Sequence, residues 1–190
     1  MLRKLFLSVL FIIFNDCSAQ LSAGSIAPDF TLTDLNGLTW NLYEQLGEGK
    51  AVILDFSTTW CEPCWDYHSS GALEEFWLNY GPVGTNEAMV FFIESDEYTD
   101  LEDLQGTGNM TQGDWLTGTE YPIIDNYDLP MEYQINYYPT LYLVCPDSTV
   151  SELDLLMSDE LYIEMNTCAT IGLEENNKTS ARIFPNPTLN

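Results

Sequence analysis

The sequence predicts an α/β fold in which helices flank a central β-sheet. Residues 51–56 (AVILDF) and 89–93 (MVFFI) are almost continuously apolar, which is typical of strands buried on both faces. Between them, apolar residues recur at the spacing of one helix face, at Leu73, Phe76, Trp77 and Tyr80. A strand, a helix and a second strand in this order indicate a right-handed parallel crossover.

The residues before the first buried strand predict an N-terminal β-hairpin. Residues 30–32 and 38–40 flank Asn36-Gly37, a dipeptide that is typical of hairpin turns. Residues 42–46 are expected to form a short helical turn. Further along, Gly81-Pro82 ends the helix of the crossover, because proline cannot continue a helix.

The second half of the chain predicts shorter elements around one more buried strand. Short helices are expected within residues 98–104 and 125–135, and between them lies a long loop, 105–120, rich in glycine, threonine and acids. Loops of this length in compact domains are often functional. The remaining elements are a strand at 140–144 (TLYLV), a turn at 146–148, a strand at 149–155 and an amphipathic helix at 159–167.

The first 19 residues have the three-part layout of a secretory signal peptide. Arg3 and Lys4 precede an apolar run at 5–14, which is shorter than the roughly 20 residues of a membrane span. We expect cleavage after Ala19, and a lipoprotein site at Cys17 is the alternative. The chain then divides into a signal peptide (1–19), one domain (20–171) and a polar linker with a tail (172–190). No later segment is long and apolar enough to be inserted stably in a membrane.

The charge balance excludes some classes of partner. The chain has 30 acidic and 5 basic residues, for a formal net charge of −25. Nucleic acids and anionic membrane surfaces bind basic patches, so neither is an expected partner. Without the signal peptide, an even number of cysteines remains, which favours disulfides in an exported protein but does not select a pairing. These cysteines are Cys61, Cys64, Cys145 and Cys168.

The segment STTWCEPCWDYH (57–68) predicts a redox-active cysteine pair. It lies where a buried strand ends and a helix begins, and a helix N-terminus stabilises a thiolate at Cys61. Pro63 suits the first helical turn, and Cys64 follows one turn after Cys61. An attacking thiolate and a second, resolving thiol are what disulfide exchange requires. A static crosslink is the alternative interpretation.

A metal site is disfavoured, and we expect neither a metal nor another cofactor. A structural zinc site needs four ligands, usually from two cysteine pairs. This chain has one such pair, and its sole histidine is His68.

The WCEPC motif after the VILDF strand resembles the thioredoxin superfamily, and in particular its exported, TlpA-type branch. The lead-in GSIAPDFTLTDLNGLTWNL resembles the N-terminal hairpin of that branch and of the peroxiredoxins. The resemblance covers residues 25–170. It implies a thioredoxin-like fold with a mixed sheet and a thiol–disulfide oxidoreductase, most simply a reductase. It also implies protein thiols and disulfides as substrates, and an upstream electron donor.

The resemblance also implies roles for individual residues. Cys61 is the nucleophile and Cys64 the resolving thiol, and Pro139 matches the cis-proline beside the cysteines. Asp55 matches the buried acid of thioredoxins. Because burial raises a carboxyl pKa, Asp55 is a candidate acceptor for the Cys64 proton. A carboxylate turned outward at the end of the strand is the alternative. Trp60 is expected to cover the disulfide.

Three aromatic residues are candidates for substrate contact. Trp60 and Tyr138 adjoin Cys61 and Pro139 in sequence, and Trp65 follows Cys64. Core packing is an equal alternative for Trp65 and its neighbour Tyr67.

Two other functions, a peroxiredoxin and a secreted binding or adhesion module, are rivals of the oxidoreductase. A peroxiredoxin motif needs a proline where this chain has Leu54, and an arginine that residues 20–171 lack, so peroxidase chemistry is disfavoured. A secreted binding or adhesion module would use Cys61–Cys64 as a crosslink only.

If the Cys61–Cys64 pair is catalytic, Cys145 and Cys168 are expected to form a structural disulfide, and a second redox pair is the alternative.

The C-terminal RIFPNPTLN resembles the start of the sorting domain used for type IX secretion in Bacteroidetes. The resemblance implies contact with that secretion machinery and an extracellular or cell-surface location, reached through the periplasm. A periplasmic location is the alternative.

Overall fold

The computed structural model describes the backbone of residues 20–179 and the side chains of residues 20–168. The predicted signal peptide (1–19) and the predicted sorting tail (RIFPNPTLN) lie outside the described residues. No helix in the described range is long and apolar enough to cross a membrane.

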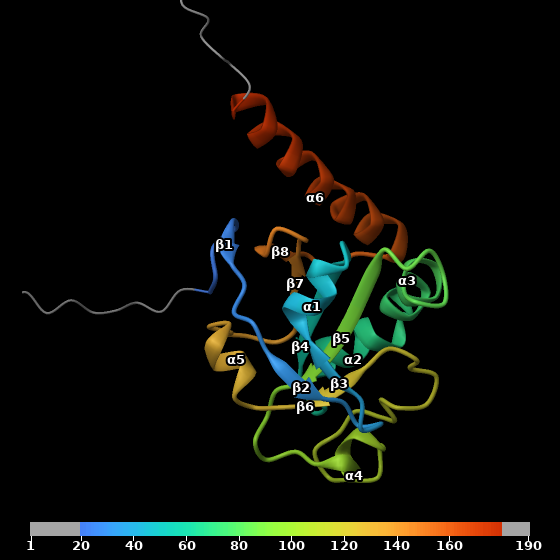
Figure 1. Ribbon diagram of the computed structural model, residues 1–190. Coiled ribbons are helices and arrows are strands. Elements are labelled where there is room, and N and C mark those ends of the chain that lie inside the picture. Colours follow the sequence, from blue (N-terminus) through green and yellow to red (C-terminus); the bar gives the residue numbers. More distant parts are fainter. Residues whose placement is uncertain (1–19, 180–190) are drawn as a thin grey trace, which may run out of the picture.

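The centre of the molecule is a six-stranded mixed sheet in the order β1-β8-β7-β4-β5-β6 (Figure 1). β4, β5 and β6 run parallel, and β7 pairs antiparallel with both β4 and β8. The predicted α/β class and mixed sheet are therefore confirmed, whereas the short strands β1 and β6 had not been predicted. The strands are β1 (Ser25–Ile26), β4 (Ala51–Ser57), β5 (Ala88–Glu94), β6 (Ile123–Asp125), β7 (Thr140–Val144) and β8 (Thr149–Leu153).

The predicted N-terminal hairpin forms a separate two-stranded sheet of β2 (Thr31–Thr33) and β3 (Thr39–Asn41). Its turn is held by Asp34, whose carboxylate accepts hydrogen bonds from the backbone N–H groups of Asn36 and Leu38. Gly37 takes a positive φ of 81°, which explains the glycine in the turn.

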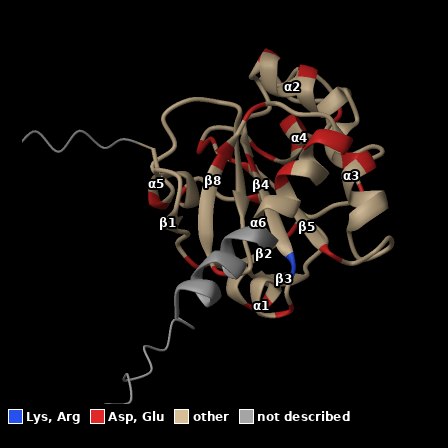
Figure 2. Ribbon diagram, turned by 90° about the horizontal axis from the view of Figure 1, so that it is seen from above, with Lys and Arg blue, Asp and Glu red and all other residues tan. Residues whose placement is uncertain are grey.

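Six helices complete the described fold: α1 (Leu42–Gly47), α2 (Glu62–Ser69), α3 (Ala72–Tyr80), α4 (Leu101–Leu104), α5 (Leu129–Glu132) and α6 (Ser158–Thr179). The single helix expected before Gly81 is two helices, because Gly71 breaks it with a φ of 76°. α6 continues past Gly172, where the composition had predicted a linker. The long loop between α4 and β6 is confirmed. Acidic residues lie on many of these elements (Figure 2).

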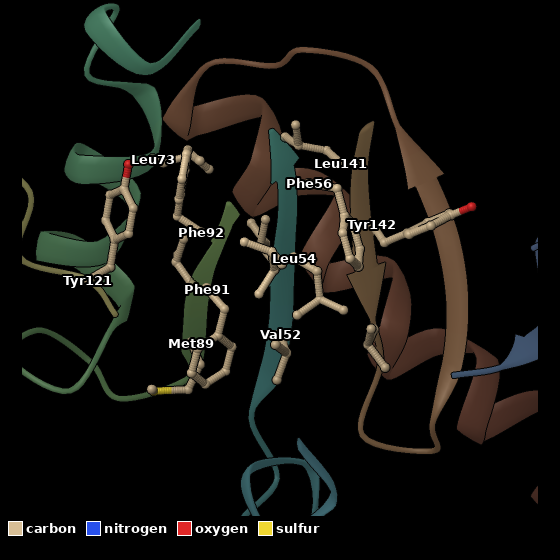
Figure 3. Packing of buried hydrophobic residues seen from close by; sticks show 14 of the residues in the cluster. Val52, Leu54, Phe56, Leu73, Met89, Phe91, Phe92, Tyr121, Leu141 and Tyr142 are labelled. Carbon is tan, nitrogen blue, oxygen red and sulfur yellow. The ribbon is translucent and has the colours of Figure 1, made fainter. Parts of the chain in front are cut away.

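The core lies on both faces of the central sheet, and β4 and β5 are buried along their whole length (Figure 3). Neighbouring residues of β5 face opposite layers. The ring of Phe91 contacts Phe30 and Trp40 of the hairpin region, each at 5.8 Å between centroids. The ring of Phe92 contacts Trp115 of the long loop at 5.4 Å. The hairpin therefore covers one face, and the long loop with α2 covers the other.

Candidate active site

The two cysteines of the WCEPC motif form a disulfide at the start of α2, with 2.08 Å between the sulfurs and 5.2 Å between the Cα atoms. Cys61 is the N-cap of the helix, and its Sγ accepts a hydrogen bond from the Cys64 N–H at 3.3 Å. Cys61 is the more exposed of the two, at 5% against 1%. Attack from outside is therefore easier at Cys61 than at Cys64.

Pro139 lies beside the strand end from which the cysteine loop departs. Phe56, near the end of β4, pairs with Thr140 at the start of β7, so Pro139 sits next to the end of β4. The Tyr138–Pro139 peptide bond is cis, as the resemblance had implied. A role for Pro139 in docking substrate stays a prediction.

Asp55 is buried in the middle strand of the sheet, with 1% of its surface exposed. It shares its register with Phe92, on the face that α2 covers. The Ser57 hydroxyl donates a hydrogen bond to its carboxylate at 2.6 Å, but burial dominates and raises the pKa of Asp55 to about 7. Burial raises the pKa of Tyr67 and of Tyr121, and the charge of Asp55 raises both further. The outward-turned alternative is therefore wrong.

Trp60 and Tyr138 both turn toward the segment that follows β5. The Trp60 indole N–H donates to the Asp96 carboxylate at 2.6 Å, and the indole remains 42% exposed. The Tyr138 hydroxyl lies 3.5 Å from the carbonyl oxygen of Ser95. The two predicted substrate contacts thus border one surface.

Trp65, on α2, lies in an aromatic cluster with His68 and Trp115. Its ring stacks on His68, with centroids 5.7 Å apart, and meets Trp115 edge-on at 5.1 Å. It also packs so closely on Gly113 that a Cβ there would lie 2.4 Å from the ring. This arrangement favours packing, and substrate contact by Trp65 stays a prediction. Tyr67 donates its hydroxyl hydrogen to the carbonyl of Leu156.

His68 does not supply a positive charge to the disulfide at neutral pH. Burial lowers the pKa of His68 to about 4. Its Nδ1 lies 3.3 Å from the Tyr121 hydroxyl, and its Nε2 lies 3.5 Å from the Thr119 hydroxyl.

The long loop fixes the two residues that precede Cys61, a role that the sequence did not reveal. The Thr59 hydroxyl donates to the Met110 carbonyl at 2.7 Å, and the Gln112 N–H donates to the Thr59 carbonyl at 2.9 Å. The side-chain amide of Gln112 donates to the Trp60 carbonyl at 2.8 Å. The loop therefore fixes the backbone that leads into the nucleophile.

A second buried carboxyl, Glu94, lies at the end of β5 and was also missed. It is fully buried and accepts hydrogen bonds from the Thr99 hydroxyl at 2.7 Å and the Asp96 N–H at 3.3 Å. Burial raises the pKa of Glu94 to about 7. Its Oε2, like the hydroxyl of Thr58, has no hydrogen-bond partner within the described part of the chain. An acid directly after the apolar run MVFFI was the available signal.

Cys145 and Cys168 form the predicted second disulfide, with Cα atoms 5.3 Å apart. Cys145 follows the end of β7 that lies opposite Pro139, and Cys168 lies inside α6 rather than at its end. This crosslink is therefore separate from the redox pair. Among the described residues, no group of three or more His, Cys, Asp or Glu side chains is placed to hold a metal ion.

Relatives with similar sequences carry the names of thiol–redox proteins. The thioredoxin-like protein YneN of Bacillus subtilis is 27% identical over 131 residues, which cover 68% of this chain and 69% of YneN. The thiol-disulfide oxidoreductase ResA of Bacillus subtilis is 28% identical over 135 residues, which cover 69% of this chain and 66% of ResA.

A solved structure shows the fold, and a family model shows the family. The thioredoxin domain of a thiol-disulfide oxidoreductase from Bacteroides vulgatus superposes with a TM-score of 0.56 and 21% identity, over 77% of this chain and 97% of that domain. The thioredoxin-like fold is thereby confirmed. The family model described as AhpC/TSA matches residues 23–153. With most of the chain matched in this way, the protein belongs to the AhpC/TSA family.

Proposed function

We propose that this protein is a thiol–disulfide oxidoreductase that works outside the cytoplasm and reduces disulfides in polypeptide substrates. The observation that carries the proposal is the Cys61–Cys64 disulfide at the start of α2, beside cis-Pro139 and above the sheet face that holds Asp55. The names of YneN and ResA agree with this class of enzyme.

The reaction starts from the reduced pair. The Cys61 thiolate attacks one sulfur of the substrate disulfide, forms a mixed disulfide and releases the other sulfur as a thiolate. Asp55 accepts the Cys64 proton, and the Cys64 thiolate then attacks Cys61 Sγ and releases the second substrate thiolate. The substrate gains two electrons and the pair loses two, so an external dithiol or equivalent donor must restore it.

The charges around the pair favour a reductant over a strong oxidant. Glu62 adjoins Cys61, and the Asp96 carboxylate accepts a hydrogen bond from the indole of Trp60, the residue before Cys61. Negative charge raises a thiol pKa, and a weakly stabilised thiolate makes the disulfide the more stable form.

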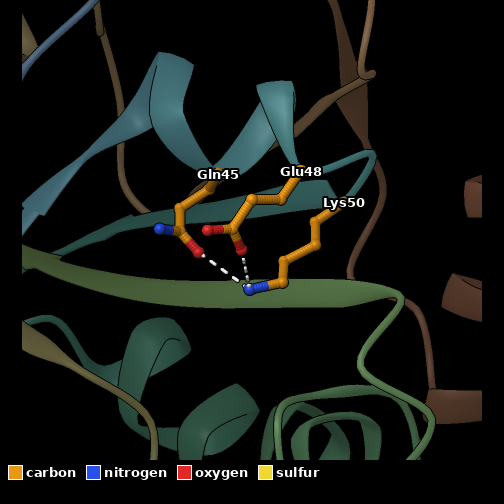
Figure 4. A network of polar contacts seen from close by, with 3 residues as sticks. All are labelled: Gln45, Glu48 and Lys50. Atoms are coloured by element: carbon orange, nitrogen blue, oxygen red, sulfur yellow. Dashed lines mark hydrogen bonds and ion pairs between the residues drawn. The ribbon is translucent and has the colours of Figure 1, made fainter.

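Within residues 20–168, no Lys or Arg that would offset this effect lies near the pair. The one Lys or Arg in that range, Lys50, lies just before β4, at the end of the strand opposite the cysteines. Its Nζ forms an ion pair with Glu48 at 2.7 Å and donates to Gln45 at 3.1 Å (Figure 4). The helix N-terminus is therefore the main stabiliser of the Cys61 thiolate.

Export is proposed from the N-terminal sequence and from the cysteines. Residues 1–19 have the layout of a signal peptide, and a second disulfide, Cys145–Cys168, fits an oxidising compartment. The periplasm, the cell surface and the extracellular medium all meet this condition. Delivery by the type IX machinery is a finer proposal, which rests on RIFPNPTLN alone.

The deciding experiment is insulin reduction with dithiothreitol. We expect Cys61→Ser to abolish turnover and Cys64→Ser to accumulate mixed disulfides. The double variant Cys145→Ser/Cys168→Ser is the control, and it should retain turnover. Equal activity in the wild type and Cys61→Ser would refute enzyme function and favour a binding module with a static crosslink.

The direction of electron flow is tested by equilibrating the pair with glutathione. We expect a potential closer to the roughly −270 mV of thioredoxin than to the roughly −120 mV of strong oxidases. A potential near the latter value would contradict the proposed direction.

A further inference from the structure

A pocket of about 440 Å³ lies next to the candidate active site, between the segment that follows β5, helix α5 and the residues that lead into β7. Three tyrosine side chains, Tyr98, Tyr127 and Tyr138, line it. Tyr98 and Tyr127 are largely exposed, at 75% and 52%. Exposed aromatic side chains around a hollow are typical of binding surfaces.

Residues that line the pocket lie next to both the cysteine pair and Pro139. Asp96, which lines the pocket, holds the Trp60 indole, and Trp60 directly precedes Cys61. Tyr138, which also lines it, directly precedes cis-Pro139. A polypeptide whose cysteine reaches Cys61 would therefore pass this pocket within a few residues, since an extended chain advances about 3.3 Å per residue.

The lining has two chemical parts. Pro130, Met131 and Ile135 provide an apolar surface, and Asp96 and Glu97 provide carboxylates. No lysine or arginine lines the pocket or follows Lys50 within residues 20–168, so no described cation of this chain competes for the carboxylates.

We propose that this pocket is a specificity subsite for a lysine or arginine side chain of the substrate polypeptide, a few residues from the substrate cysteine. The inference rests on the proposed function only for the identity of the substrate. The tyrosine faces attract a cation, and the aliphatic stem of lysine or arginine covers the apolar surface while its charged end meets the carboxylates.

Glu97 is the carboxylate best placed to select charge. Asp96 already accepts hydrogen bonds from the Trp60 indole and from the Tyr98 backbone N–H. Glu97 interacts with the Tyr98 hydroxyl, and this hydrogen bond with the Glu97 charge raises the pKa of Tyr98. Carboxylate and aromatic ring thus meet at one edge of the pocket, where a substrate ammonium or guanidinium group can contact both.

The test begins with binding to the oxidised protein, so that turnover is not needed. Peptides with blocked ends carry serine in place of the cysteine. Each peptide has one lysine, placed at one of the positions from three before to three after the serine. A second peptide with the uncharged norleucine at the same position is the control. Titration is followed by the NMR signals of labelled tyrosine rings. At one position we expect lysine to bind about tenfold more tightly than norleucine, which corresponds to about 1.4 kcal/mol.

Substitutions in the pocket test which residues cause the preference for lysine over norleucine. Glu97→Gln and Tyr127→Leu should each lower the lysine-to-norleucine ratio at least about threefold, within the range for one surface ion pair or cation–π contact. Glu75→Gln removes the same charge from an exposed position on α3 and should leave the ratio unchanged. An unchanged ratio in Glu97→Gln and Tyr127→Leu would overturn the proposal, as would equal binding or a preference for norleucine at every position.

Reduction of the matching cysteine peptides, supplied as mixed disulfides with 2-mercaptoethanol, is measured separately. Lysine binding without reduction of any peptide would refute the proposed function and leave the cation site standing. Reduction of all peptides at equal rates, with no difference in binding, would refute the cation site and leave the proposed function standing.

Discussion

Replacing Asp55 by asparagine should change the pH dependence of stability. The folded protein holds this carboxyl at a pKa of about 7, against an ordinary value of 3.8. A raised carboxyl pKa means that the folded state binds the proton more tightly than the unfolded chain does. The contribution of Asp55 to the free energy of unfolding is therefore greatest at low pH and falls as pH rises from about 4 to 7.

The size of the effect follows from that shift. At pH 8 the unfolded chain has lost the proton, and the folded chain must carry the charge in a buried site. At pH 5 the folded chain still keeps the proton. With about 1.4 kcal/mol per pKa unit, the wild type should lose roughly 2–3 kcal/mol relative to Asp55→Asn between these two pH values.

Other consequences of the substitution do not depend on pH. The asparagine amide can still accept the Ser57 hydrogen bond, and any cost of its unpaired N–H groups is the same at pH 5 and pH 8. Glu94, whose pKa is also raised to about 7, is present in both proteins. Its contribution cancels when the two are compared.

The assay is urea unfolding of the oxidised proteins, followed by tryptophan fluorescence at constant ionic strength. The free energy difference between Asp55→Asn and wild type should grow by roughly 2–3 kcal/mol from pH 5 to pH 8. Asp66→Asn, at an exposed position on α2, is the matched control. A difference for Asp55→Asn that is equal at both pH values would refute a buried carboxyl with a raised pKa.

Three further predictions concern the surroundings of the pair. The double variant Cys145→Ser/Cys168→Ser opens a loop with a sequence separation of 23 and should lose about 3 kcal/mol in urea unfolding, while insulin reduction persists. Gly113→Ala places a Cβ 2.4 Å from the Trp65 ring and should lower the unfolding free energy by roughly 1–3 kcal/mol; an unchanged midpoint would mean that the loop yields freely. The imidazole of His68 should titrate near pH 4 by NMR, and titration near pH 6.5 would contradict its burial.

The sequence was most informative where one physical pattern dominated. Two nearly uninterrupted apolar runs predicted β4 and β5, because buried parallel strands leave few positions for polar residues. The hairpin was predictable because Asn36-Gly37 suits its turn. The strands β1 and β6 were missed because they have two and three residues, too few for a period to be visible.

The surroundings of the cysteines were less predictable, because they depend on contacts between distant segments. The long loop holds Thr59 and Trp60 through one side-chain amide, one hydroxyl and backbone groups. None of these contacts produces a recognisable sequence pattern. The break between α2 and α3 was missed because the helix was predicted from the apolar spacing after Gly71, and that spacing does not reveal the left-handed backbone of Gly71.

Both buried carboxyls contradict the pattern of the strand that carries them. A strand buried on both faces should exclude charged residues, yet Asp55 lies inside one such strand and Glu94 ends its parallel neighbour. Departures from the sequence pattern of a secondary-structure element are most often found at functional sites. Asp55 was identified because a known motif lay six residues downstream, whereas Glu94 had no motif beside it. The same physical test, an acid within or directly after a continuous apolar strand, would have selected both, and both carry a pKa raised to about 7.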